Sequence, residues 1–254
     1  MVSRKVLLVL VEGMSEIKAL RSGFTRQFDK EKYEIIFRLS RGHKNENGSF
    51  DRSADITSMY GVSPNNITNK LVSEFNIKGL FQEQPIDEKD IAEIIHIVDM
   101  DGAYISDEKV VLPIKFEKDK NEKVKYCDDC IIAYDVDGIR ERNERKSKNL
   151  NFLLGLEKIK IKRVEIAYSI YFFSSNLDQF LYGEANLDSK MKVPKAEEFA
   201  RNCRNDSDYF NKTFVNGQFV AAGMSYEESW NYIKEGCNSL KRFTNLNILF
   251  ERYA

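Results

Sequence analysis

A β-rich apolar run from Lys5 to Val11 stops abruptly at Glu12-Gly13. Because its apolar residues do not alternate with polar ones, the run predicts a strand that is buried on both faces, as in a parallel sheet. Apolar residues then recur at helical spacing after Ser15, which we expect to cap the helix, and residues 33–39 return to a strand pattern. This order predicts a β-α-β unit with parallel strands and a right-handed crossover.

The alternation of strand and helix patterns continues, and the predicted fold class is α/β, a parallel sheet flanked by helices. Residues 40–55 carry turn formers and charge without periodicity, which predicts a mobile loop. A lysine-rich stretch between two short β-like runs predicts a β-hairpin insertion over about 105–134. We expect a main domain over 1–183 and a helical C-terminal lobe over 184–254. The other expected elements are helices over 65–81 and 139–154 and strands over 91–98 and 165–173.

The composition limits the possible functions. The chain has 254 residues, of which 42% are apolar and 31% charged, so it can bury a core. Lys plus Arg (39) nearly balances Asp plus Glu (40), so any nucleic-acid binding must be local. No stretch approaches the roughly 20 apolar residues of a membrane-spanning helix, and the first apolar run is too short for a signal peptide. We therefore expect a cytoplasmic protein without a membrane partner.

The cysteine and histidine counts restrict the kind of metal site. Cys127 and Cys130 form a single C-x-x-C pair, and the other two cysteines and the two histidines are scattered. Structural zinc usually takes two such pairs. A metal in this protein must therefore be held by carboxylate oxygens, which suit Mg²⁺ or Mn²⁺.

Acidic residues follow three of the predicted strands. Glu12 follows the first strand, Asp99 and Asp101 follow the strand over 91–98, and Asp178 lies shortly after the strand over 165–173. The carboxyl ends of parallel strands share one edge of a sheet, where ligands bind. Carboxylates gathered there repel one another unless a cation lies among them, and two-metal sites use them to clamp phosphodiester oxygens. The sequence therefore predicts a divalent-metal site at this edge.

Two motifs resemble the Toprim fold, in which V-E-G-x-x-E follows an apolar strand and D-x-D ends a later one. They are Val11-Glu12-Gly13-Met14-Ser15-Glu16 and Ile97-Val98-Asp99-Met100-Asp101. Toprim domains occur in topoisomerases, primases and the OLD-like and RloB-like nucleases. Residues 173–181 are also similar to the Ser-Asn-Pro-x-Phe-Glu segment of RloB-like proteins, although the proline and the acid differ. The resemblance covers about residues 4–183.

The resemblance implies a Mg²⁺-dependent or Mn²⁺-dependent nuclease that hydrolyses phosphodiesters of DNA or tRNA. Glu12 would be a metal ligand or acid/base, Asp99 and Asp101 would hold the metal, and Glu16 would support a second ion. Asp178 would be a further metal ligand, on a weaker correspondence with the family motif. The resemblance also implies an effector of phage defence by abortive infection. Because the chain has no G-x-x-x-x-G-K-[ST] loop, the ATPase that accompanies such nucleases would be a separate partner. Homo-oligomerisation is left open.

The predicted helix over 139–154 has a basic, amide-rich face suited to phosphate contacts, and a solvated charged helix is the alternative. Lys146 or Lys148 is the candidate for the cation that neutralises developing phosphorane charge, and Lys148 completes the predicted catalytic set of Glu12, Asp99 and Asp101. The D-x-D-G at Asp135 to Gly138 predicts a helix cap.

Other roles for the acidic residues remain open at this point. Asp99-Met100-Asp101-Gly102 also resembles the first motif of haloacid-dehalogenase-like phosphatases, in which the first Asp is the nucleophile, but Ala103 replaces the usual threonine. A catalytically inactive Toprim interaction module is the non-enzyme alternative. In simpler interpretations Glu12 accepts hydrogen bonds from a helix N-terminus, Asp99 and Asp101 are turn residues, Glu16 is a solvated helix residue and Asp178 caps a helix.

Overall fold

The computed structural model of the chain describes residues 4–40, 55–74, 86–113 and 124–254. The loop predicted over 40–55 lies outside these residues except at its two ends. Of the helix predicted over 65–81, the structure describes α2 (Ile67–Glu74).

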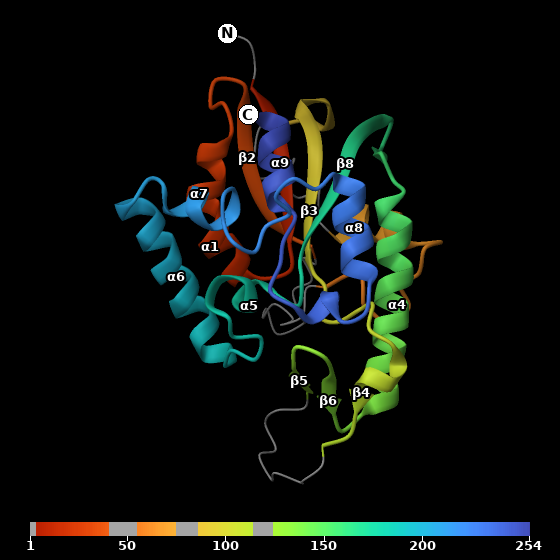
Figure 1. The fold of residues 1–254 in the computed structure, drawn as a ribbon. Helices are drawn as coiled ribbons and strands as arrows, with labels where there is room; N and C mark the ends of the chain where they lie inside the picture. Colours follow the sequence, from red (N-terminus) through yellow and green to blue (C-terminus); the bar gives the residue numbers. More distant parts are fainter. Residues whose placement is uncertain (1–3, 41–54, 75–85, 114–123) are drawn as a thin grey trace.

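A five-stranded sheet forms the centre of the protein, in the order β2-β1-β3-β8-β7 (Figure 1). Four of its strands are parallel, and β7 pairs antiparallel with β8, so the α/β class is confirmed but the sheet is mixed rather than wholly parallel. The sequence prediction missed β7 because this edge strand has only four residues, two of them exposed lysines. The strands are β1 (Lys5–Val11), β2 (Tyr33–Leu39), β3 (Ile91–Asp99), β7 (Lys158–Ile161) and β8 (Val164–Phe173).

Helices cover both faces of the sheet, which explains the uninterrupted apolar run of β1. Alternate residues of β1 point to opposite faces, so Leu8 and Leu10 join one hydrophobic cluster and Leu7 and Val9 join the other. The first cluster includes residues of α2, α4 (Val136–Leu154) and α8 (Tyr226–Lys234). The second includes residues of α1 (Met14–Phe24), α5 (Leu177–Tyr182), α6 (Ser189–Asn205), α7 (Tyr209–Phe214) and α9 (Leu246–Tyr253).

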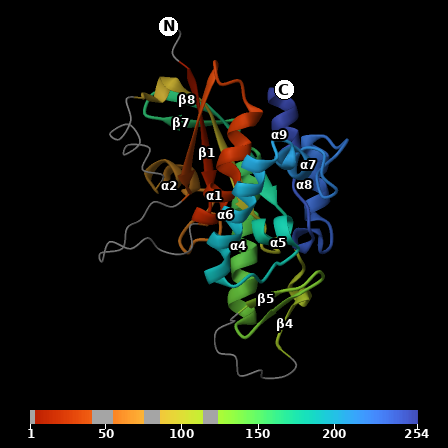
Figure 2. The same cartoon turned by 90° about the vertical axis from the view of Figure 1, so that its left-hand side faces the viewer.

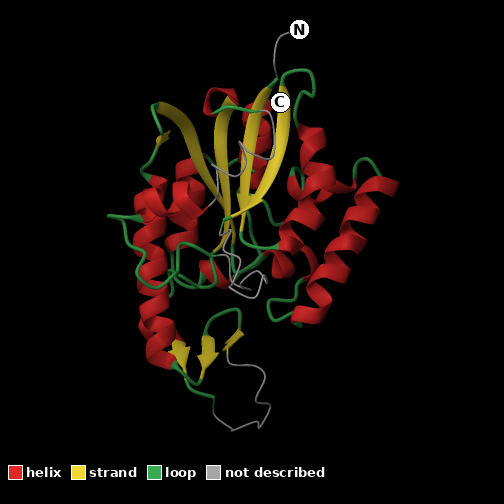
Figure 3. Cartoon of the chain, turned by 180° about the vertical axis from the view of Figure 1, so that it is seen from behind, coloured by secondary structure: helices red, strands yellow, loops and turns green. Residues whose placement is uncertain are grey.

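A small three-stranded sheet lies at the N-terminal end of α4 (Figure 3). Its order is β4-β6-β5, formed by β4 (Val110–Val111), β5 (Val124–Tyr126) and β6 (Ile131–Ala133). Strands β5 and β6 are antiparallel and joined by a short turn, so the region contains a β-hairpin. The two runs that flank the lysine-rich stretch correspond to β4 and β6, however, and these strands pair parallel, so the predicted hairpin between them was wrong. Ile131 packs with Ile139 of α4 and with Leu240 of the C-terminal region in a separate hydrophobic cluster.

The region after residue 184 is helical, as predicted, and it packs into the same clusters as the sheet. Trp230 lies against Phe172 of β8 with ring centroids 5.0 Å apart, and Phe250 lies against Phe24 of α1 at 5.2 Å. The boundary at residue 183 stays a prediction, since residues from both sides of it contribute to the same hydrophobic clusters. None of the helices in the described part of the chain has the length and apolar character to cross a membrane.

The helix caps agree with one sequence prediction and contradict another. The side chain of Asp135 accepts a hydrogen bond from the Gly138 amide at 2.9 Å, so the second D-x-D-G is a helix cap. Helix α1, however, begins at Met14 with Gly13 as its N-cap, so the prediction for Ser15 was wrong. The Ser15 hydroxyl instead donates to the Glu16 carboxylate at 3.1 Å.

Gly23 is the point where α1 meets α7 (Figure 2 shows both helices). A Cβ at this position would lie 2.0 Å from Cδ2 of Phe210. We expect Gly23→Ala to lower the free energy of unfolding by about 1–3 kcal/mol through overpacking, although alanine is the better helix former by about 1 kcal/mol. Urea unfolding measures this, with Ser22→Ala on the same helix as a near-neutral control. A Gly23→Ala protein as stable as the wild type would contradict this packing.

Candidate metal centre

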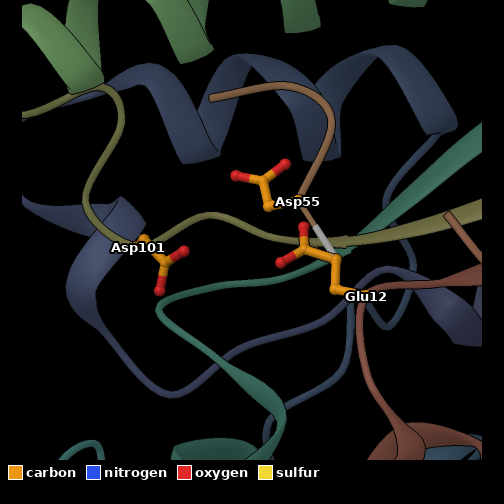
Figure 4. Close-up of side chains that lie close together, drawn as sticks. All are labelled: Glu12, Asp55 and Asp101. Carbon is orange, nitrogen blue, oxygen red and sulfur yellow. The ribbon is translucent and has the colours of Figure 1, made fainter. Parts of the chain in front are cut away.

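Three carboxylates converge at the carboxyl ends of β1 and β3 (Figure 4). One oxygen each from Glu12, Asp55 and Asp101 lies within 4.8 Å of the other two. Glu12 directly follows β1 and Asp101 lies two residues beyond β3, so these two predicted residues are brought together. Asp55, from the segment before α2, completes the group and was not predicted.

The backbone after β3 makes a tight turn that aims Asp101 at the group. Asp101 and Gly102 both adopt left-handed conformations, with φ of 50° and 72°. The amide of Asp101 donates to the Ser175 carbonyl at 2.8 Å, which ties the turn to the segment after β8. Asp101 is thus both a turn residue and a member of the acidic group, so the simpler interpretation of this position does not exclude the functional one.

The carboxylate of Glu12 bridges the two strand ends. Its Oε1 accepts a hydrogen bond from the Asp99 amide at 3.0 Å. The simpler prediction, that Glu12 accepts from a helix N-terminus, is therefore wrong. This bond orients the Glu12 carboxylate toward the end of β3, which Asp101 follows by two residues.

The ammonium group of Lys146 lies among the three acids. Its Nζ is 2.9 Å from Asp55 Oδ2, 2.9 Å from Asp101 Oδ2 and 3.8 Å from Glu12 Oε1. The side chain is fully buried. Lys146 is in helical phase with the buried residues Ile139, Leu150 and Leu153, and this spacing is the sequence signal that distinguishes it from Lys148.

Lys148 does not reach the acidic group. Its side chain is 63% exposed, and its Nζ pairs with Glu144 on the same helix at 2.6 Å. Residues i and i+2 of an α-helix point in directions that differ by roughly 200° around the helix axis. Lys146 and Lys148 therefore cannot face the same site. The choice of Lys148 for the catalytic set is therefore corrected to Lys146.

The electrostatics show that one lysine does not neutralise the group. Burial raises the pKa of Glu12 well above its ordinary value, Asp55 raises it further, and Lys146 only partly opposes these effects. Burial also acts to raise the pKa of Asp55, but Lys146 and hydrogen bonds from Ser58 and Thr57 outweigh it and lower that pKa to about 2. A further cation at this position would lower the repulsion that remains.

Asp99 belongs to a second, adjacent group rather than to the first. Its Oδ1 accepts a hydrogen bond from the Leu177 amide at 3.1 Å. Burial raises the pKa of Asp99 well above its ordinary value, and Glu16 and Asp101 raise it further. Asp99 therefore interacts electrostatically with Glu16 of α1 as well as with Asp101, and it is not one of the three residues whose oxygens converge.

A second lysine serves this second group. Lys192 of α6 pairs with Asp178 at 2.8 Å, and its pKa is raised by Asp178, Asp99 and Glu16 against the effect of burial. Glu16 and Asp178 are only 8% and 4% exposed. Glu16 is therefore not a solvated helix residue, and α5 is capped by Asn176 rather than by Asp178. Lys192 was not predicted, because it lies in the polar first turn of α6 outside any motif.

The basic face of α4 is used mainly to hold backbone segments around the site. Arg142 donates to the Asp101 carbonyl at 2.8 Å and to the Tyr126 hydroxyl at 2.7 Å. Arg140 donates to the Asp107 carbonyl at 3.0 Å. Two of the predicted phosphate contacts therefore already donate to other parts of the protein, while the solvated face of α4 is formed by other residues, such as Asp137 and Lys148, which are 88% and 63% exposed.

Asp55 is placed by the same helix. Asn149 of α4 donates to the Thr57 carbonyl at 2.8 Å and to the Val62 carbonyl at 3.2 Å, and Arg145 donates to the Ser58 carbonyl at 2.7 Å. The position of Asp55 thus depends on contacts with residues about ninety positions later in the chain. No local pattern around residue 55 carries that information.

The chain matches no protein-family model, and it has no detectable similarity to a curated protein or to a solved structure. The resemblance to Toprim domains therefore rests on the two motifs that contain Glu12, Asp99 and Asp101.

Proposed function

We propose that this protein is a metal-dependent nuclease that hydrolyses nucleic-acid phosphodiesters at the group formed by Glu12, Asp55 and Asp101. The observation that carries the proposal is the convergence of these three carboxylates at the carboxyl edge of the sheet, within 4.8 Å of one another. The donor set consists of oxygens only, which fits Mg²⁺ or Mn²⁺ rather than a thiophilic metal. The repulsion left by Lys146 gives the group a physical need for another cation.

Each residue has a defined part in this proposal. Glu12, Asp55 and Asp101 would hold the ion, which supplies Lewis-acid stabilisation of a phosphoryl group and lowers the pKa of water. Lys146 fixes the orientation of the Asp55 and Asp101 carboxylates through its two contacts of 2.9 Å. Its positive charge also favours the approach of a phosphate to an otherwise acidic edge.

The adjacent group extends the proposal to a second ion. Glu16, Asp99 and Asp178 supply three further carboxylates, of which Asp178 is paired with Lys192. Paired acidic groups of this kind clamp the attacking and leaving oxygens in two-metal hydrolysis. Lys192 neutralises part of this charge, and unlike the first group the oxygens of these three residues do not all lie within 4.8 Å of one another, so a second ion would have to draw them together.

The biological setting is part of the same proposal. The motif resemblance supports a Toprim nuclease of the RloB-like or OLD-like kind, an effector of phage defence that cuts DNA or tRNA and works with a separate ATPase in the cytoplasm. The phosphatase alternative would use Asp99 as a nucleophile beside Asp101. It leaves Glu12 and Asp55 without a role, so the convergence of these residues favours the nuclease.

The test is cleavage of plasmid DNA and of total tRNA by the purified protein, with Mg²⁺, with Mn²⁺ and with EDTA. We expect metal-dependent cleavage, and Glu12→Gln should lower its rate by at least about 100-fold, since a lost ligand removes several kcal/mol of metal-derived stabilisation. Asp137→Asn is the matched control, because the Asp137 side chain lies on α4 and is 88% exposed.

The outcomes separate the alternatives. Cleavage that persists in folded Glu12→Gln would contradict the assigned site. Hydrolysis of a phosphomonoester without cleavage of either nucleic acid would favour the phosphatase. A protein that folds and binds Mg²⁺, yet cuts nothing with or without a co-expressed ATPase partner, would favour the inactive module.

A further inference from the structure

The turn that begins with Asp55 also presents an exposed aromatic ring. Tyr60 is 90% exposed, whereas most large apolar side chains of the described residues are buried. A tyrosine ring left in water forgoes the burial that usually stabilises an aromatic side chain. Its place, five residues after a member of the acidic group, makes it a candidate contact for whatever binds there.

The exposure of Tyr60 does not come from a loosely held turn. Arg145 and Asn149 of α4 hold the carbonyls of Ser58, Thr57 and Val62, as described above. Beyond the ring, Asn66 donates to the Gly61 carbonyl at 2.9 Å. The ring is therefore presented from a turn that is anchored on both sides, so little conformational entropy would be lost when a ligand stacks on it.

A cation accompanies the ring. The guanidinium carbon of Arg145 lies 6.0 Å from the centroid of Tyr60. Within the described part of the chain, the only hydrogen bond of Arg145 is the one from Nε to Ser58, which leaves both Nη groups for an outside acceptor. Lys148 and the partly exposed Phe152 follow three and seven residues later, on the same face of α4. Two cations of α4, the first of them next in sequence to Lys146 of the acidic group, thus lie between two aromatic rings along one strip.

We propose that Tyr60 and Arg145 form a stacking platform for an unpaired nucleobase, so that the site acts on single-stranded nucleic acid. The base would stack on the Tyr60 ring and a neighbouring phosphate would accept from the Arg145 Nη groups. In a duplex both faces of each base are covered by neighbouring bases, and the ring would have no free face to contact. This inference rests on the proposed nuclease function, because it assigns the substrate class of the same site.

The test is fluorescence anisotropy with labelled oligonucleotides of one sequence, as single-stranded RNA, as single-stranded DNA and as the DNA duplex. The Glu12→Gln background with Mg²⁺ prevents cleavage during the measurement. We expect tighter binding of single strands than of the duplex. Tyr60→Ala should weaken single-strand binding by roughly 5- to 150-fold, the equivalent of about 1–3 kcal/mol for one stacked base, and Tyr60→Phe should retain it. The comparison of single-stranded RNA with single-stranded DNA identifies which nucleic acid is preferred.

Tyr134→Ala is the matched control, because Tyr134 is an exposed tyrosine before the first turn of α4, far along the helix from Arg145. Equal single-strand binding by Tyr60→Ala and its parent would overturn the platform, as would equal losses for the single strand and the duplex. Because cleavage by the wild-type protein is measured separately, metal-dependent cleavage with unaltered Tyr60→Ala binding would overturn this inference alone. Absence of both cleavage and binding would count against the proposed function as well.

Discussion

Lys146→Met is expected to lower the free energy of unfolding by about 3–5 kcal/mol in EDTA, because it leaves buried carboxylates without their internal counter-charge. Methionine keeps the aliphatic bulk of the fully buried lysine, so the loss reports on charge rather than on packing. Mg²⁺ should restore more stability to Lys146→Met than it adds to the wild type, since the ion replaces the missing cation and no longer competes with the ammonium. Urea unfolding with EDTA and with Mg²⁺ measures both effects.

Lys148→Met is the control for this experiment. It makes the same chemical change two residues away, at a side chain that is 63% exposed and paired only with Glu144. Exposed pairs of this kind contribute little, about 0.3–0.5 kcal/mol. Equal stabilities of Lys146→Met and Lys148→Met in EDTA would show that the lysine is not needed to neutralise the group. Equal stabilisation of Lys146→Met and wild type by Mg²⁺ would show that the ion does not bind beside Lys146.

Asp55→Asn is expected to abolish most of the metal-dependent chemistry. The substitution keeps the shape of the side chain and removes one of the three converging carboxylates, while Thr57 can still donate to the remaining carbonyl oxygen. We expect the affinity for Mn²⁺ and the cleavage rate each to fall by at least about 100-fold. Isothermal titration and the cleavage assay measure the two quantities.

Asp55→Asn distinguishes a ligand from a residue that only shapes the loop. If Asp55 merely anchored its turn, the variant would lose thermal stability and keep its affinity for Mn²⁺. Asp137→Asn is again the matched control, because it makes the same substitution at an exposed side chain. Unaltered Mn²⁺ binding in a folded Asp55→Asn protein would remove Asp55 from the site and leave the two residues that the sequence predicted.

The parts of the fold that the sequence predicted are those with strong local patterns. Strand β1 was recognised with its observed bounds, Lys5–Val11, because burial on both faces leaves an uninterrupted apolar run. Strand β7 was missed, because a short edge strand with exposed lysines has no such pattern. The proximity of Glu12 and Asp101 could be predicted from the sequence, since the carboxyl ends of parallel strands share one edge of the sheet.

By itself, the sequence determined the α/β alternation and the acidic residues at the strand ends. The helical spacing of Lys146 with Ile139, Leu150 and Leu153 was present in the sequence, but the prediction chose Lys148 and the structure corrected it. Only the tertiary structure decided that Asp55 joins Glu12 and Asp101, and that Asp99 instead lies with Glu16 and Lys192. The physical reason is that Asp55 is placed by α4, through Asn149, and Lys192 by the packing of α6 against α1. Contacts between distant segments leave no periodicity in the chain, so the acids that share a cation become visible only when the helices are in place.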